Sequence, residues 1–212
     1  MVGLSDARTN YIIANCVIVF HPVQAGESNL SASMRRDIIM MCSQINDRPA
    51  TRRQNMVEIM RTVKAGDIAG DFTLQDHNGS NFVLSAQRGK RVLLSFHPLA
   101  WTAVCASQML SLEENFAVFE SLKTVSAGLS VDAVPSKKAW AENIGINKVP
   151  LLCDFWPHGG VAKIYDIFRE KNGFSERANI IIDDKGVIAF FKTYPLSQLP
   201  DINEIIATIR RM

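Results

Sequence analysis

Beyond about residue 63, short apolar runs alternate with amphipathic stretches along the chain. The runs are bounded by turn residues and are rich in β-branched and aromatic side chains, so they predict strands. We expect strands at 71–74, 80–84, 91–96, 125–131, 149–153, 178–183 and 187–193. Apolar residues that recur at helical spacing predict helices at 102–123, 135–143, 159–167 and 198–211.

The order of these elements indicates the fold class. Strand, helix, strand, helix, hairpin, helix is the topology of a thioredoxin-like α/β fold, in which helices flank a central mixed sheet. The hairpin is predicted by the turn residues Asp183-Asp184-Lys185-Gly186, which separate the last two strands. We therefore expect one α/β domain over residues 63–212.

Residues 1–62 differ from the rest of the chain in composition and in hydrophobic pattern. An apolar run at 11–20 precedes a stretch rich in Gly, Ser and Asn at 25–33, and helices are predicted at 33–45 and 51–61. We expect a mostly helical N-terminal extension. Because it shows no chemistry of its own, its simplest role is that of an interaction or dimer-packing element.

Composition and charge exclude several classes of protein. Hydrophobic residues make up 47% and charged residues 21% of the chain, which is typical of a globular protein. The net charge is only +2 and the basic pairs are scattered, so nucleic acid is not an expected partner. No apolar run reaches the roughly 20 residues of a membrane span. The run at 11–20 is interrupted by Asn15 and preceded by Asp6, which favours the cytoplasm over export by a weak signal.

The four cysteines are Cys16, Cys42, Cys105 and Cys153. They form no C-x-x-C pair and do not interleave with the histidines at metal-ligand spacing, so neither a metal nor another cofactor is expected. Their wide spacing is also unlike that of a disulfide-stapled secreted domain, which favours a reducing compartment.

Cys105 stands where an apolar strand runs into the start of a predicted helix. Unpaired N–H groups and the helix dipole at that end favour the thiolate, which is the nucleophilic form of cysteine. Thr102, three residues earlier, is placed so that its hydroxyl can cap the helix and contact a thiolate or a bound oxygen. Pro98 turns the chain out of the strand and shields the sulfur from water.

The spacing P-x-x-x-T-x-x-C, formed by Pro98, Thr102 and Cys105, resembles the active-site signature of the peroxiredoxins, the alkyl hydroperoxide reductase and thiol-specific antioxidant family. The resemblance extends over residues 63–212. It includes the segments VKAGDIAGDFTLQDHNG, VDAVPSKKAWAENIGI, VPLLCDFWPHGGVAKIYDIF and FSERANIIIDDKGVI. It departs from the family pattern at Gly70, commonly proline, and at Ala103, but neither departure removes a reacting group.

The resemblance implies an enzyme, a thiol-dependent peroxidase that reduces hydrogen peroxide and organic hydroperoxides in antioxidant defence. Cys105 would be the peroxidatic residue, oxidised to a sulfenic acid. Arg177 and Thr102 would hold the thiolate and the peroxide, with Pro98 shielding them, and Gln108 would brace the loop by hydrogen bonds. Trp101 and Trp140 match aromatic positions near the pocket, where plain core packing is an equal interpretation.

The sequence leaves open which thiol reduces the sulfenic acid on Cys105. Position 110, five residues after Cys105, is leucine, and no cysteine lies near the C-terminus. The segment VPLLCDFWPHG resembles the one-cysteine branch related to bacterial alkyl hydroperoxide reductase E, which implies a homodimer and an external thiol reductant of the thioredoxin, glutaredoxin or mycoredoxin type. Cys153, at a strand end, is either a resolving cysteine or an inert buried thiol, and Cys42 is a more remote resolving candidate.

Two other functions use the same residues. A disulfide reductase would need a second cysteine at position 108, where the chain has glutamine. A peroxide sensor or redox-regulated interaction protein would pass the oxidation of Cys105 to a partner, and this is the main alternative to a peroxidase. His97 is treated as structural or surface, and Glu58 is likewise assigned no role.

Overall fold

The computed structural model describes residues 12–13, 16–17 and 63–212. In the first part, β1 (Ile12–Ile13) pairs antiparallel with β2 (Cys16–Val17). The predicted helices at 33–45 and 51–61, and Cys42, lie outside the described residues. The division of the chain into 1–62 and 63–212 stays a prediction.

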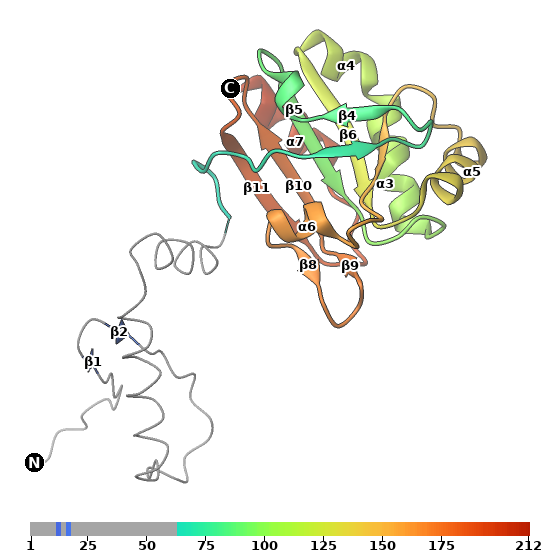
Figure 1. Ribbon diagram of the computed structural model, residues 1–212. Coiled ribbons are helices and arrows are strands. Elements are labelled where there is room, and N and C mark those ends of the chain that lie inside the picture. Colours follow the sequence, from blue (N-terminus) through green and yellow to red (C-terminus); the bar gives the residue numbers. More distant parts are fainter. Residues whose placement is uncertain (1–11, 14–15, 18–62) are drawn as a thin grey trace, which may run out of the picture. The chain divides into compact units, whose positions relative to one another are not determined.

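A five-stranded mixed sheet forms the centre of the domain, in the order β11, β10, β5, β6, β7 (Figure 1). Its strands are β5 (Arg91–Phe96), β6 (Thr124–Ser130), β7 (Leu151–Cys153), β10 (Arg177–Ile182) and β11 (Ile188–Tyr194). Strands β5, β6 and β7 are parallel, and β10 is antiparallel to both β5 and β11. The predicted mixed sheet and its final hairpin are therefore confirmed.

Two smaller antiparallel pairs accompany the sheet. They are β3 (Thr73–Gln75) with β4 (Asn81–Val83), and β8 (Phe168–Arg169) with β9 (Phe174–Ser175). The second pair was not predicted, because two-residue strands are too short to show a period. A short 3₁₀ turn, η1 (Ser85–Gln87), follows β4.

The helices are α3 (Ala103–Glu114), α4 (Phe116–Ser121), α5 (Val134–Ile144), α6 (Gly160–Ile164) and α7 (Ile202–Arg210). The prediction of one helix over 102–123 was wrong, because the helix breaks at Asn115, whose side chain bonds back to the carbonyl of Ser111. The predicted helix 159–167 ends early, before Asp166, which has a left-handed φ of 54°. α7 begins only after Asp201, whose carboxylate accepts from the N–H of Asn203.

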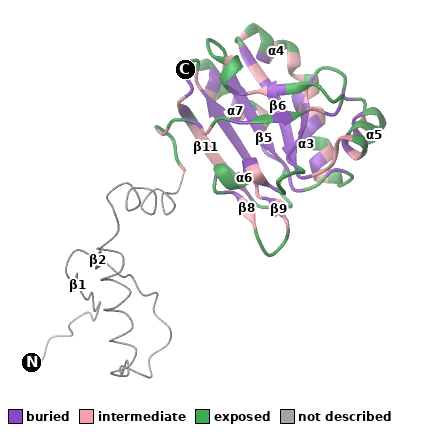
Figure 2. Ribbon diagram, in the orientation of Figure 1, coloured by how far each residue is buried: buried purple, intermediate pink, exposed green. Residues whose placement is uncertain are grey.

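The sheet separates two apolar clusters; β10 and nearly all of β5 are buried, whereas the edge strand β11 is largely half-buried or exposed (Figure 2). Along β5, Leu93 belongs to the cluster under α3, α4, α5 and α7, while Leu94 belongs to the cluster under β3, β4 and α6. Cys105 and Trp140 are members of the first cluster. In the described part of the chain, no helix combines the length and apolarity that crossing a bilayer demands.

Close packing of α3 on the sheet depends on Gly128 in β6. A methyl group there would overlap the sulfur of Met109 and lie 2.9 Å from Cδ2 of Leu151. Gly128→Ala is therefore expected to lower the free energy of unfolding by about 1–3 kcal/mol, the usual cost of overpacking. Urea denaturation measures this. Ser126→Ala, on the same strand, is the control, since it removes a buried hydroxyl that has no partner and should cost little.

Candidate active site

The register of the sheet brings together residues that are 72 positions apart in the chain. Ala178 in β10 pairs with Phe96 at the end of β5, so Arg177 lies beside the point where the chain leaves β5. The following loop leads into α3, which carries Cys105 in its first turn. Cys105 and Arg177 therefore meet at the carboxyl end of β5.

Cys105 lies at the amino end of α3 and is only 1% exposed. Ala106 is the first residue here whose N–H reaches back to the carbonyl of Thr102, at 2.9 Å. The N–H groups of the preceding turn, including that of Cys105, have no acceptor within the helix. These donors and the positive end of the helix dipole favour negative charge at the sulfur.

Arg177 is the cationic residue that contacts Cys105, and its side chain is itself buried. Its Nη2 donates to Sγ of Cys105 at 3.4 Å and to the carbonyl of Leu196 at 2.8 Å. Its Nη1 donates a short hydrogen bond to Oε1 of Gln108. A guanidinium stays protonated at all physiological pH values, so the sulfur lies against a permanent cation.

Gln108 connects Arg177 to the strands beneath. Its Nε2 donates to Oγ of Ser95 at 2.7 Å and to the carbonyl of Phe96 at 3.2 Å. Ser95 in turn donates to Oδ1 of Asn179 at 2.8 Å. This buried chain fixes the position of the guanidinium. Ser95 and Asn179 were not predicted, although both are polar residues inside apolar strands, which is the signal that could have found them.

The loop before α3 is held by its neighbours. The N–H of Ala100 donates to Asp132, which also accepts from Ser130, and Nε1 of Trp101 donates to Oγ of Ser136. Trp101 has a left-handed φ of 63° and is 56% exposed. A bulky residue in that conformation is strained and must be held by its surroundings, which is common beside functional sites.

Thr102 occupies the capping position of α3, but its hydroxyl donates to the carbonyl of Leu99 at 3.2 Å and makes no capping bond. The expectation that its side chain caps the helix was therefore wrong. The preceding left-handed turn at Trp101 folds the loop back, which brings the Leu99 carbonyl within reach. Thr102 is exposed, whereas Pro98 is buried.

Cys153 ends β7 and is also buried, at 6% exposure. Burial raises the pKa of its thiol to about 11, although the charge of Lys137 works in the other direction. The sulfur is 3.9 Å from the carbonyl of Leu151 and borders a cavity of about 250 Å³ that Phe155 and Trp156 also line. Cys153 is therefore a neutral thiol at physiological pH.

Two further buried polar residues, His97 and Lys137, lie near the carboxyl ends of β5 and β7. His97, the residue after β5, is fully buried, and neither ring nitrogen has a hydrogen-bond partner. Its ring packs on Trp140 at 5.4 Å between centroids, which makes His97 a core residue and not a surface one. Lys137 in α5 is fully buried as well, and sequence reasoning missed it. The signal was a lysine in line with Val134, Trp140 and Ala141 on the apolar face of a predicted helix.

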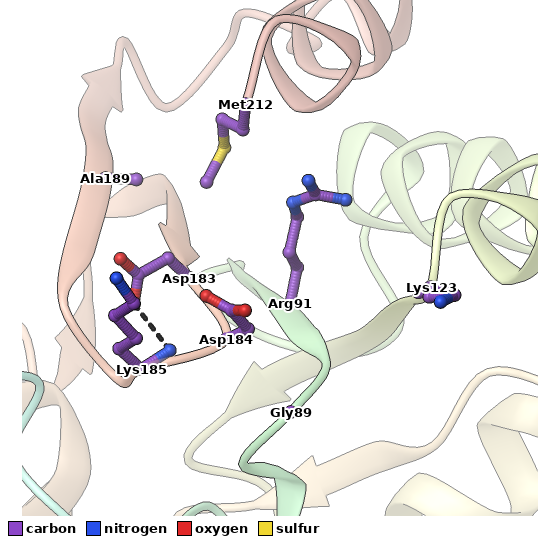
Figure 3. Close-up of a pocket in the computed structure, with 8 residues that line it drawn as sticks. All are labelled: Gly89, Arg91, Lys123, Asp183, Asp184, Lys185, Ala189 and Met212. Atoms are coloured by element: carbon purple, nitrogen blue, oxygen red, sulfur yellow. Dashed lines mark hydrogen bonds between the residues drawn. The ribbon is translucent and has the colours of Figure 1, made fainter.

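A cavity of about 470 Å³ lies at the other end of β5 (Figure 3). Its wall carries Arg91, the first residue of β5, together with Lys123, Asp183 and Lys185. It is polar and contains no thiol, so it has no part in the chemistry of Cys105. Within residues 63–212, no three potential metal-binding side chains converge.

Comparison with known proteins agrees with this geometry. The family model described as AhpC/TSA family matches residues 65–191. Alkyl hydroperoxide reductase E of Mycobacterium tuberculosis is 39% identical over 129 residues, which cover 60% of this chain and 84% of that protein. Peroxiredoxin 2 of Thermoplasma acidophilum is 34% identical over 152 residues, covering 69% and 75%.

Solved structures show the same fold. The reduced 2-Cys peroxiredoxin of Plasmodium vivax superposes with a TM-score of 0.64 at 26% identity, covering 70% of this chain and 81% of that one. The thioredoxin-like fold class predicted from the sequence is therefore confirmed.

Replacement of Gln108 tests the chain of hydrogen bonds under the site. Gln108→Leu leaves a donor of buried Arg177 without an acceptor, so the free energy of unfolding should fall by about 1.5–3 kcal/mol. The guanidinium should also be held less firmly against the sulfur. We expect alkylation of Cys105 by iodoacetamide at pH 7, followed by mass spectrometry, to slow several-fold. Gln198→Leu, at an exposed position, is the control, and equal alkylation rates in the two variants would contradict the assignment.

His97 makes the fold sensitive to acid. Burial, followed by the charges of Lys137 and Arg177, holds the pKa of His97 well below its ordinary value of 6.5. Below about pH 6.5 the unfolded chain binds a proton that the folded chain rejects, so stability falls as the pH falls. Between pH 7 and pH 5 this contributes a loss of about 2 kcal/mol.

We expect His97→Leu to remove that part of the pH dependence. Urea unfolding at both pH values measures it, and His158→Gln, at an exposed histidine, is the matched control. A wild-type slope retained in His97→Leu would show that the imidazole is not kept neutral by the fold.

Proposed function

Because the chain belongs to the AhpC/TSA family and is a thiol-dependent peroxidase of the peroxiredoxin type, we propose that Cys105 is the residue that attacks the peroxide. The observation that carries this assignment is the 3.4 Å contact between Nη2 of Arg177 and the buried sulfur at the amino end of α3. A helix terminus and a permanent cation both favour the thiolate there.

In the proposed reaction, the Cys105 thiolate attacks the terminal oxygen of a hydroperoxide and the oxygen–oxygen bond breaks. The sulfur gains that oxygen with its hydrogen and becomes the sulfenic acid, while the other oxygen leaves with the bonding electrons and takes up a proton from solvent to give water or an alcohol. In this proposal Arg177, which contacts the sulfur, and the N–H of Cys105 stabilise the negative charge that develops on the oxygens. Thr102, which is exposed, contacts the incoming peroxide, Pro98 shields the sulfur, and Gln108 holds the guanidinium.

The sulfenic acid is then reduced by an external thiol. That thiol displaces the hydroxyl of the sulfenic acid as water and forms a mixed disulfide, which a second thiol breaks to regenerate Cys105. Cys153 is a poor internal reductant, because burial raises the pKa of its thiol to about 11. The reductant is of the thioredoxin, glutaredoxin or mycoredoxin type, the compartment is the reducing cytoplasm, and the protein acts as a homodimer.

Reaction of the reduced protein with one equivalent of hydrogen peroxide tests the assignment. Stopped-flow kinetics should show rapid oxidation in wild type and its loss in Cys105→Ser. Intact-mass spectrometry should find a product heavier by one oxygen. Cys153→Ser should oxidise as wild type does and give the same product.

Two results would contradict these proposals separately. Equally slow oxidation of wild type and Cys105→Ser would remove Cys105 as the nucleophile. A wild-type product lighter by two hydrogens, absent from Cys153→Ser, would instead make Cys153 the resolving residue.

A further inference from the structure

Lys137 is a charged group that the proposed reaction does not yet use. It lies on the face of α5 that packs against the sheet, and it is 0% exposed, whereas Lys138 beside it is exposed. Its Nζ donates to the carbonyl of Leu152 in β7 at 2.8 Å. It forms no ion pair with any carboxylate among the described residues. A buried ammonium group of this kind is costly unless the protein gains something from it.

The position of Lys137 links it to the site. Leu152, its acceptor, is near the carboxyl end of β7, in the parallel part of the sheet. One turn further along α5, Trp140 packs on His97, which begins the loop from β5 to Cys105. Trp140 and Cys105 also share one buried cluster. The buried face of α5 therefore packs near the carboxyl ends of the parallel strands, where the loop from β5 to Cys105 begins.

Four groups from the surrounding elements interact with the charge of Lys137. They are Cys153 in β7, Asp132 before α5, Asp154 after β7 and Cys105 in α3. Two histidine rings also interact with that charge, His97 after β5 and His77 in the turn between β3 and β4, and in both the charge of Lys137 helps to lower the pKa. Burial lowers the pKa of Lys137 to about 8, while the four groups oppose that shift. The ammonium form therefore predominates at neutral pH.

The two carboxylates already have other partners. Asp132 accepts from the N–H of Ala100 and from Ser130, and Asp154 accepts from the N–H groups of Val161 and Ala162, at the start of α6. Both carboxylates hold loops in place and take no part in the proposed reaction.

The two thiols that face Lys137 differ from the carboxylates. Cys153 is neutral at physiological pH, because burial raises the pKa of its thiol to about 11. In the proposed reaction, Cys105 changes from an anion to a sulfenic acid. Of the four groups, it is therefore the one whose interaction with Lys137 varies during turnover.

We infer that Lys137 is a positioning residue for the peroxidase reaction, in which its buried ammonium charge favours the Cys105 thiolate from α5 while Arg177 does so by contact from β10. The inference rests on the proposed role of Cys105 as nucleophile. A charge in a dry interior acts over several ångströms, because little water screens it. Lys137 thus extends the positive environment of the sulfur beyond the residues that touch it.

The test is the pH dependence of Cys105 oxidation by hydrogen peroxide in single-turnover stopped-flow experiments between pH 5 and pH 9. All variants carry Cys153→Ser, which removes the other thiol that faces Lys137. Lys137→Met replaces the ammonium by an apolar chain of similar length, and Lys137→Arg keeps the charge. Lys138→Met is the matched control, one residue away and exposed.

In Lys137→Met we expect the midpoint of the rate profile to move up by about 0.5–1 pH unit. The rate on the acid side should fall about three- to tenfold, with an unchanged plateau at high pH. The rate profile of Lys138→Met should match that of the Cys153→Ser parent, and the midpoint in Lys137→Arg should stay close to the parent's. If Lys137→Met does not fold, Lys137→Gln, which keeps a donor for Leu152, takes its place with the same expectation.

An unshifted midpoint in a folded Lys137→Met or Lys137→Gln variant would overturn the inference. So would a uniform loss of rate at every pH, since that is the signature of a structural defect. The Cys105→Ser variant distinguishes failure of the proposed nucleophile from failure of the role of Lys137. If Cys105→Ser is still oxidised rapidly, the proposed nucleophile is wrong. If Cys105→Ser is not oxidised and the midpoint in Lys137→Met is unshifted, only the role of Lys137 is removed.

Discussion

The contact between the Arg177 guanidinium and the Cys105 sulfur is the interaction on which the rest of the site depends. Burying a guanidinium is costly unless each of its donors is satisfied, and no described carboxylate pairs with this one. Its partners are the Leu196 carbonyl, Gln108 and the sulfur. The two neutral acceptors carry no charge that balances the guanidinium, so the sulfur is the partner at which negative charge is stabilised. The antiparallel pairing of β10 with β5 makes this contact possible.

The same arrangement leaves the site region locally weak. His97 has two buried ring nitrogens without partners, and Trp101 holds a left-handed backbone. Such features lower the free energy needed for local opening. Opening is required by the proposed chemistry, since Cys105 is 1% exposed and an external thiol must reach its sulfur.

The sequence predicted the strands of the central sheet and its hairpin from local patterns, and the family resemblance placed Arg177 at Cys105; the short strands β8 and β9 were missed. The break at Asn115 and the bond from Thr102 to Leu99 depend on single dihedral angles and were not predictable. Lys137 and His97 were missed for a different reason. Whether a polar side chain on an apolar face is buried depends on its tertiary neighbours, which a one-dimensional pattern does not contain.

Cys105 and Cys153 show why position in the fold does not by itself make a thiol reactive. Cys105 lies in the helix that follows β5 and Cys153 is the last residue of β7; β5 and β7 belong to the parallel part of one sheet, and both cysteines are buried. Cys105 gains a helix terminus and a contacting guanidinium, whereas the main effect on Cys153 is loss of water, which raises its pKa to about 11 despite the charge of Lys137. A cation without direct contact therefore does not overcome desolvation at Cys153. At Cys105, contact with Arg177 and the helix terminus already stabilise negative charge, so the inferred contribution of Lys137 adds to theirs and does not have to overcome desolvation alone.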